Sequence, residues 1–292
     1  MILYLVAAVV AIAVLISFYQ KNTNSVCKSK RRLDGITALV TGGTDGMGLQ
    51  IAIEFAKRGA RVIVACPFPK EGAEALKIIV EESGNKNVEF KHLDLACLKS
   101  VNYFGQFLLT ILLLPLLMKT GTQQEPSRIV NTGSILHHVG HIDVHNLNGI
   151  SATNKWLLAQ VYANSKIALL SFNFELARRL RATNVVVNAV DPGLVGTNIY
   201  YGVNSLVGIV AKFCFRNMYK TPLEGAQTAI HVALDEGAGK LSGGYFSNCN
   251  VNVANRRAYD EETAQLLWTE SARLVSLTDD EIKHFMNGTL LE

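Results

Sequence analysis

Residues 36–48 read ITALVTGGTDGMG, and this stretch decides the fold. Residues 36–41 are mostly apolar and β-branched, which is typical of a buried strand. Gly42, Gly46 and Gly48 follow at a turn, and an amphipathic stretch begins directly after them. The missing side chains at such a turn let the backbone approach a pyrophosphate, whose charge the helix N–H groups then receive. The stretch therefore predicts a strand, a dinucleotide-binding turn and a helix.

A second group of residues, in the other half of the chain, suits proton transfer. Residues 127–134, SRIVNTGS, predict an apolar strand that ends at Ser134, and open α/β sheets place their chemistry at such strand ends. Tyr162 and Lys166 fall in a helix predicted over residues 154–181, and their spacing of four puts both side chains on one helix face. A nearby ammonium favours the phenolate, so the pair suits an acid/base group.

The spacing Thr-Gly-x-x-x-Gly-x-Gly from Thr41 to Gly48 resembles the cofactor fingerprint of the short-chain dehydrogenase/reductase family. The resemblance covers residues 36–277 and is nearest to the membrane-anchored branch of retinol-dehydrogenase-like and dehydrogenase/reductase X-type proteins. It implies an α/β fold with a Rossmann-type doubly wound parallel sheet, and an NAD(P)-dependent oxidoreductase. It also implies that Met47 contacts the cofactor together with Thr41 and the three glycines.

The resemblance assigns a role to each residue that matches the family pattern. Ser134 would hydrogen-bond the substrate oxygen, Tyr162 would exchange its proton, and Lys166 would bind the nicotinamide ribose while tuning Tyr162. Asn102 matches the helix asparagine that holds a proton-relay water, and Asp94 matches the aspartate that contacts the adenine. The loop beside the nicotinamide carboxamide is matched by residues of VDPGLVGT, namely Pro192, Gly193 and Thr197.

The cofactor preference depends on the end of a second strand, predicted at residues 61–66. An acid there would accept a hydrogen bond from the 2′-OH of NAD, and a basic residue would pair with the 2′-phosphate of NADP. The chain has Pro67 at this place, with Lys70 the nearest cation. NADP(H) is slightly favoured because no acid excludes it, and NAD(H) stays open. Asp94 ends a third strand predicted over residues 88–95, where an ordinary turn residue is the alternative to the adenine contact.

The N-terminal segment predicts a membrane attachment. Residues 2–19 carry no charge, and as a helix they reach roughly 27 Å, about the thickness of a hydrocarbon core. Five cations and no acid follow in residues 21–32, which directs the rest of the chain to the cytosol. We expect a single-pass protein of the endoplasmic reticulum with a transmembrane signal anchor over residues 1–20, a basic cytosolic flank over residues 21–35 and a short-chain dehydrogenase/reductase-like domain over residues 36–292. A cleaved signal peptide is the alternative.

The composition excludes several function classes. Of the 28 basic residues five lie in residues 21–32, so the other 280 residues are nearly neutral, with 23 basic against 24 acidic residues, and no nucleic-acid partner is expected. The 5 cysteines form no CxxC pair, so neither a disulfide framework nor a zinc cage is predicted. Histidines at positions 137, 138, 141 and 145 lack the ligand pattern of a metal site, and no metal is expected. A monomer and a homo-oligomer both stay open.

Two apolar segments bear on packing and on the substrate. Residues 107–118, interrupted by Pro115, are too short to span a membrane and predict a buried core helix. Residues 206–215 are apolar with basic flanks, so they are either a core helix or a substrate lid that rests on the bilayer surface. A membrane-proximal apolar pocket suits a small lipophilic substrate such as a retinoid, a steroid or a polyprenyl-like compound.

Between Asp94 and Asn102 the chain is too short for the family pattern. A third parallel strand should be followed by a crossover, and then by a fourth strand that ends in Asn-Asn-Ala-Gly, but a crossover alone needs about a dozen residues. The sheet is therefore predicted to lack one central strand. We expect the strand at residues 127–134 to pair directly with that at residues 36–41, because a gap would leave backbone groups unpaired.

These features leave two function classes. The retained catalytic residues favour an NAD(P)-dependent oxidoreductase that interconverts a lipophilic alcohol and its aldehyde or ketone at a membrane surface. The missing strand favours a catalytically impaired, membrane-tethered isoform or a non-enzymatic binding protein.

Overall fold

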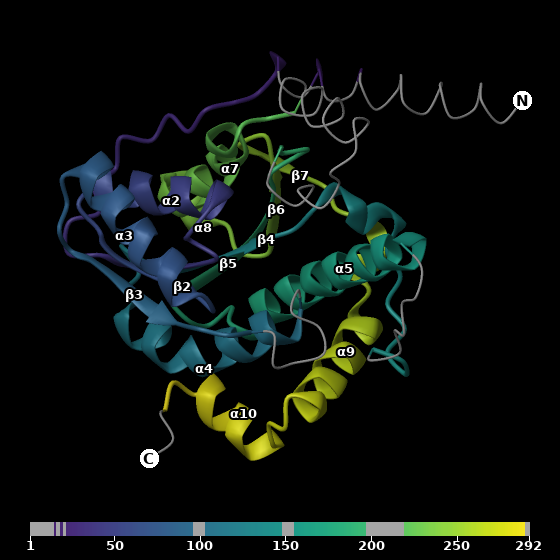
Figure 1. Ribbon diagram of the computed structural model, residues 1–292. Coiled ribbons are helices and arrows are strands. Elements are labelled where there is room, and N and C mark those ends of the chain that lie inside the picture. The colour runs from purple at the N-terminus through teal and green to yellow at the C-terminus, as the bar shows by residue number, and fades with distance from the viewer. Residues whose placement is uncertain are drawn as a thin grey trace, which may run out of the picture. The chain divides into compact units, whose positions relative to one another are not determined.

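The computed structural model of the chain describes most of its residues and divides them into two compact units. The described residues are Leu15, Phe18, Tyr19 and the ranges 22–95, 103–147, 155–196 and 219–289, without the side chains of residues 155–158. The first unit comprises Met1–Leu93 and Pro192–His231, and the second comprises Asp94–Asp191 and Val232–Glu292. Each unit has its own sheet (Figure 1).

The first unit is built on a three-stranded parallel sheet in the order β1-β2-β3. Val64 of the middle strand lies opposite Val40 on one side and Phe90 on the other. Its side chain is fully buried because this strand has a neighbour on both sides and helices connect it to each. The elements of this unit are β1 (Thr37–Thr41), α2 (Gly46–Lys57), β2 (Arg61–Cys66), α3 (Pro69–Ser83), β3 (Val88–His92) and most of α7 (Pro222–Leu234).

Local sequence signals account for the helices of the first unit. Asp45 caps α2, and Ala52 and Ala56 on its inner face are buried. Pro69 opens α3, where its fixed φ suits the first turn, and Gly84 ends the helix with φ +70° in the left-handed region. The expected strand at residues 61–66 is confirmed, and the third strand ends at His92, three residues earlier than expected.

The second unit is built on a four-stranded sheet in the order β4-β5-β6-β7. The first three strands are parallel, and β7 runs antiparallel to β6. The elements of this unit are α4 (Phe104–Thr120), β4 (Ser127–Thr132), the 3-10 helix η1 (Ile135–Val139), α5 (Lys155–Arg179), β5 (Val185–Asp191), α8 (Glu236–Lys240), β6 (Gly244–Ser247), β7 (Asn250–Asn252), the 3-10 helix η3 (Arg256–Tyr259), α9 (Glu261–Leu274) and α10 (Asp279–Met286).

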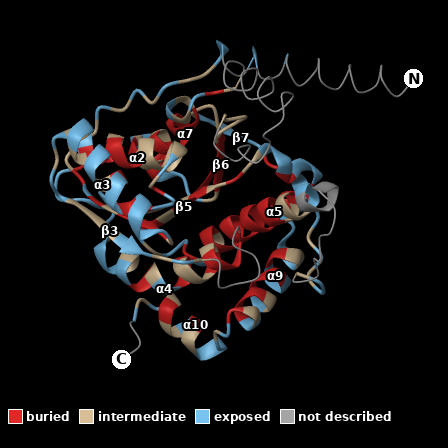
Figure 2. Cartoon of the chain, in the orientation of Figure 1, coloured by how far each residue is buried: buried red, intermediate tan, exposed pale blue. Residues whose placement is uncertain are grey.

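Aromatic side chains form the centre of the second unit's core. Phe107 of α4 contacts Phe172 of α5, with ring centroids 5.1 Å apart, and Trp268 of α9 at 5.4 Å. Ile111 and Leu114 lie on the same buried face of α4. The expectation of a buried core helix at residues 107–118 is confirmed, and α5 is buried along much of its length (Figure 2).

The expected direct pairing of the fifth strand with the first was wrong. β1 is the edge strand of one sheet and β4 is the edge strand of the other, and no described strand lies between β3 and α4. The expectation assumed that unpaired backbone groups at the gap would be dry. In β1, however, Thr37, Leu39 and Thr41 are exposed, so backbone groups of this strand can bond to water. Hydration of this strand edge would remove most of the free-energy cost of unpaired backbone groups, which was expected to drive the direct pairing of the two strands.

The predicted anchor falls almost entirely outside the described residues. Within the residues that the structure describes, no helix has the length and apolar character to cross a membrane. The run at residues 2–19 lies outside them apart from Leu15, Phe18 and Tyr19. Residues 206–215, the expected core helix or lid, also lie outside the described residues.

Candidate functional site

The turn between β1 and α2 brings backbone segments unusually close together. Gly42 and Gly46 have φ of +63° and +55°, a region that L side chains rarely adopt. A Cβ at Gly48 would lie 2.2 Å from the carbonyl oxygen of Gly42, so a larger residue would displace the turn. The glycines that the sequence singled out are therefore required by the backbone geometry itself.

The start of α2 is suited to an anion. The first N–H groups of a helix have no intrahelical partner and carry the positive end of the helix dipole. Asp45 accepts a hydrogen bond from the Gly46 N–H at 2.7 Å, and the first turn of the helix contains no acidic residue. Thr41, which ends β1, is exposed beside this turn. The open backbone and the helix start together fit the pyrophosphate of a dinucleotide.

The loop after β5 belongs to the same unit as the glycine turn. Val195 forms a parallel bridge with Lys220, and the Gly196 N–H donates to the Lys220 carbonyl at 3.0 Å. A Cβ at Gly225 would lie 2.5 Å from Val195 Cγ2 and 2.8 Å from Met47 Sδ, so Met47 and the loop both pack against the start of α7. Of the predicted loop residues, the structure describes Pro192 and Gly193, and Thr197 lies outside the described residues.

Two other predicted residues lie outside the described part of the first unit. Asp94 is exposed after β3 and is counted with the second unit. Asn102 lies outside the described residues. At the end of β2, Cys66 Sγ accepts a hydrogen bond from the Phe68 N–H at 3.4 Å, and Lys70 is exposed on the first turn of α3. No acid stands at the end of β2 to select the ribose of NAD.

Lys166 is the most constrained of the predicted catalytic residues. Its side chain is buried, and its Nζ donates a hydrogen bond to the carbonyl oxygen of Thr132 at 2.8 Å. The same Nζ lies 5.4 Å from the ring centroid of Tyr162, which is half-buried one turn earlier on α5. Since Thr132 ends β4 two residues before Ser134, the ammonium links the helix that carries Tyr162 to the strand end that leads to Ser134.

A buried carboxylate acts on Lys166. Burial lowers the pKa of Lys166 to about 8, and the charge of Asp191 acts in the opposite direction. Asp191 ends β5, is 4% exposed, and accepts a hydrogen bond from the Tyr245 hydroxyl at 2.8 Å. Burial, followed by the charge of Asp191, raises the pKa of Tyr245, so this hydroxyl stays a donor. Lys166 is therefore mainly an ammonium at pH 7, with a buried anion to offset its desolvation.

Ser134 precedes η1 and is fixed by hydrogen bonds of both its side chain and its carbonyl. It is extended, and its Oγ accepts a hydrogen bond from the Leu136 N–H at 3.3 Å. The carbonyl of Ser134 lies 2.6 Å from Nδ1 of the fully buried His137, whose Nε2 accepts the Asn255 N–H at 3.1 Å. Because Nε2 is an acceptor, Nδ1 carries the proton and donates to Ser134. Burial lowers the pKa of His137, which favours this neutral form.

Sequence reasoning missed Asp191, Tyr245 and the part played by His137. Asp191 stands in the VDPG motif, where only the proline and glycine were considered. An acid at the end of a buried strand, in a chain with a predicted catalytic lysine, is a signal that could have identified it. His137 was weighed only as a metal ligand, and nothing in the sequence indicates that it meets Asn255, 118 residues later.

Comparison with known proteins identifies the family of the chain. The short chain dehydrogenase family model matches residues 36–100 and 96–205. The chain belongs to the short chain dehydrogenase family, whose members are NAD(P)-dependent oxidoreductases. The two matched segments meet at residues 96–100, within the stretch where the sequence predicts a missing strand.

Several curated relatives align over most of the chain. Human retinol dehydrogenase 11 is 35% identical, with 88% of this chain and 91% of the relative covered. Human retinol dehydrogenase 13 is 34% identical (89% and 91%), and bovine retinol dehydrogenase 12 is 34% identical (86% and 90%). The first alignment extends over 299 positions although it covers 88% of a 292-residue chain, so the relative has residues with no counterpart here.

Solved structures at lower identity share the fold. An uncharacterized protein from Mycobacterium Paratuberculosis aligns with TM-score 0.64 and 23% identity over 87% of this chain and 98% of its own. The Pseudomonas aeruginosa RhlG/NADP active-site complex aligns with TM-score 0.58 and 23% identity, over 74% and 95% of the two chains. These similarities establish the Rossmann-like α/β fold.

Proposed function

We propose that the chain is an NAD(P)-dependent oxidoreductase that interconverts a lipophilic alcohol and its aldehyde or ketone. The observation that carries this proposal is the buried Lys166, whose Nζ contacts the strand end before Ser134 and lies beside the Tyr162 ring. A buried cation costs stability, so its place next to the acid/base candidate is better explained by chemistry than by packing.

The residues of the chain divide the work of such a reaction. The bound cofactor supplies or accepts the hydride. Ser134 Oγ would donate a hydrogen bond to the substrate oxygen, and the Tyr162 hydroxyl would give that oxygen a proton during reduction and take it back during oxidation. The Lys166 ammonium stabilises the phenolate that remains after the proton has left. Each of these steps uses an atom of the second unit.

The cofactor residues of the first unit favour NADP(H) slightly over NAD(H). Gly42, Gly46, Met47 and Gly48 form the turn and helix start that would hold the pyrophosphate. The absence of an acid after β2 leaves room for a 2′-phosphate, and the RhlG complex shows NADP bound to a protein of the same fold. Asp94 and the loop that starts at Pro192 remain the proposed adenine and nicotinamide contacts.

The proposed substrate is small and lipophilic, with a retinoid as the first choice. Ile135, Leu136 and Val139 follow Ser134 and are 38%, 41% and 64% exposed, so apolar side chains border the catalytic serine. The names of the curated relatives favour a retinoid over a steroid or polyprenyl compound. The uncharged run at residues 2–19 supports attachment to the endoplasmic reticulum membrane with the catalytic residues in the cytosol.

A second candidate function is a membrane-tethered binding protein without turnover. The observation that favours it is the division of the described strands into two sheets, with β1 and β4 each at an edge. Hydride transfer is sensitive to misplacement by about 1 Å, so a protein that lacks a central strand could keep binding and lose the reaction.

Ligand-dependent unfolding and turnover separate these candidates. One sample of the full chain in detergent is unfolded by heat in the presence of NADPH or NADH. A second, unheated sample is assayed with retinal and the reduced cofactors, and with retinol and the oxidised cofactors NADP+ and NAD+. An oxidoreductase should show a stabilisation of about 2.7 kcal/mol at a cofactor concentration of 100 times Kd, together with turnover. Stabilisation without turnover on any of several lipophilic aldehydes and alcohols supports the binding protein. No stabilisation by either cofactor overturns both candidates.

A further inference from the structure

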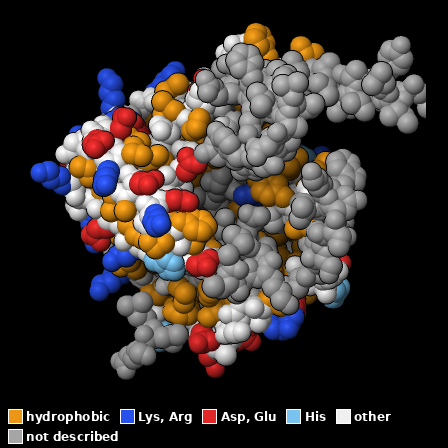
Figure 3. Space-filling view, viewed as in Figure 1, with side chains coloured by type: hydrophobic (Ala, Val, Ile, Leu, Met, Phe, Trp, Pro, Cys, Tyr) orange, Lys and Arg blue, Asp and Glu red, His pale blue; other side chains and the backbone are white. Residues whose placement is uncertain are grey.

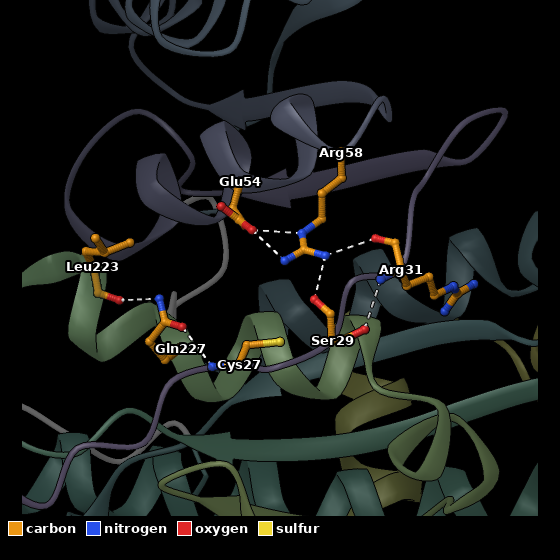
Figure 4. Close-up of polar contacts among 7 residues, drawn as sticks. All are labelled: Cys27, Ser29, Arg31, Glu54, Arg58, Leu223 and Gln227. Atoms are coloured by element: carbon orange, nitrogen blue, oxygen red, sulfur yellow. Dashed lines mark hydrogen bonds and ion pairs between the residues drawn. The ribbon is translucent and has the colours of Figure 1, made fainter.

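The basic flank is held against the first unit by its own backbone. Residues 24–33 contain neither helix nor strand, and Figure 4 shows them running past α2 and α7. The Cys27 N–H donates to Gln227 Oε1 of α7 at 3.0 Å. Arg58 Nη1, at the end of α2, donates to the carbonyls of Ser29 at 2.8 Å and Arg31 at 3.0 Å. The flank is therefore fixed at several points along its length.

Arg58 is itself held in place for this contact. Glu54, one turn earlier on α2, accepts its Nε and pairs with its Nη2, both at 2.7 Å. The carbonyl of Arg58 accepts the N–H of Leu33, at 2.8 Å, and the Leu33 side chain is buried. A planar guanidinium held by a carboxylate has its remaining donors pre-aimed at the two flank carbonyls.

This docking gives the flank an inner and an outer side. Cys27, Ser29 and Arg31 are half-buried and Leu33 is buried. The residues between them, Lys28, Lys30 and Arg32, are all exposed. In an extended chain alternate side chains point to opposite sides, and residues two apart lie roughly 7 Å from each other. The outer side is therefore a row of three cations. Among the residues that the structure describes, the acid paired to this row is Asp34, through Arg32 at 2.8 Å.

We propose that Lys28, Lys30 and Arg32 form a docking surface for anionic phospholipid headgroups. The inference rests on the proposed membrane attachment, because the cationic row begins nine residues after the uncharged run at residues 2–19. Like-charged groups in one exposed row suit a planar anionic surface, and cations near such a surface strengthen binding about five-fold each. Since α2 and α7 hold the row, lipid binding would also fix how the dinucleotide-binding unit faces the membrane.

The surface over α3 provides an internal comparison. Acidic and basic side chains are interspersed on that face (Figure 3), and α3 carries both Lys70 and Glu71 in its first turn. Lys70 is exposed like Lys28 and Lys30, but it has an acid beside it in the sequence. An exposed lysine that does not contact lipid should react like Lys70, at a rate that anionic lipid leaves unchanged. A lysine that docks on anionic lipid should react more slowly when that lipid is present.

The test is lysine acetylation of the full chain in lipid nanodiscs, read by mass spectrometry. We expect Lys28 and Lys30 to react several-fold more slowly in discs of phosphatidylcholine with phosphatidylserine than in phosphatidylcholine alone. Lys70 should react at the same rate in both. Salt at 1 M, where the Debye length is about 3 Å, should remove the difference.

The remaining outcomes and one variant decide the proposal. Equal rates for Lys28 and Lys30 in the two kinds of disc overturn it, and so does equal protection in both, which would indicate coverage by a second copy or a zwitterionic surface. A chain that does not enter the discs overturns the membrane attachment as well. Arg58→Gln should free the flank and weaken the lipid-dependent protection; unchanged protection would overturn the preformed row.

Discussion

The glycine turn of the first unit and the Ser134–Tyr162–Lys166 set of the second are built in different ways. The turn is defined by its backbone. Gly42 has a positive φ, its carbonyl leaves no room for a Cβ at Gly48, and N–H groups lie at the start of α2. The proposed catalytic set is made of side chains, and the charge of Lys166 depends on burial and on Asp191 of another strand. A site formed by backbone keeps its geometry without contacts from other segments, whereas a site formed by side chains loses its geometry when a partner residue from another segment moves.

The largest effect should come from removing the Tyr162 hydroxyl. Tyr162→Phe should lower turnover by roughly 10²–10⁴-fold, because the proton donor is lost. The cofactor-induced rise in Tm should stay, since the glycine turn belongs to the other unit. Turnover and thermal unfolding of the same preparation measure both. A variant that loses the Tm rise as well would contradict the division of labour between the two sites.

Next comes the aromatic core of the second unit. Phe107→Ala removes a fully buried ring and should cost about 3–5 kcal/mol in the free energy of unfolding. Leu112→Ala on the same helix, at a position that is 43% exposed, is the matched control and should cost far less. Denaturant unfolding gives the cost, and hydrogen exchange of β4 and β5 amides locates it. Similar costs for the two variants would argue against this core.

Because Lys166 is buried, we expect the free energy of unfolding to rise with pH in the alkaline range. Its folded pKa is lowered to about 8 from 10.5, so between these pH values the unfolded state binds more protons and stability rises with pH. The upper limit is roughly 3 kcal/mol. Lys166→Met should lose this slope, whereas exposed Lys70→Met should keep it, as measured by denaturant unfolding from pH 7 to 10.5. A slope that persists in Lys166→Met would mean that another group causes it.

A smaller effect is expected at the glycine turn. Gly48→Ala places a methyl against the Gly42 carbonyl and should cost about 1–3 kcal/mol. It should also abolish stabilisation by NADPH while the alkaline slope of Lys166 stays. Glu74→Ala, an exposed change on α3, is the control and should keep the response to NADPH. If Gly48→Ala still responds to NADPH, the cofactor does not use this turn.

What the sequence could predict follows the same division. The strand at residues 61–66 and the core helix around Phe107 were predictable because apolar pattern and length are local signals. The glycine turn was predictable because its geometry restricts residue type. That β1 and β4 belong to different sheets was not predictable, because the hydration of a strand edge depends on what surrounds it. The Asp191–Tyr245 contact joins strands 54 residues apart, and no local pattern records it.

The open edge of β1 has a consequence for the chain in the cell. Leu39 is 40% exposed on a strand that has one hydrogen-bonded neighbour among the described strands. Such an edge can template the addition of a strand from another molecule, and natural proteins usually protect it with charges or proline. β1 has neither. We therefore expect chaperones and proteases to have a measurable effect on the amount of this protein at steady state.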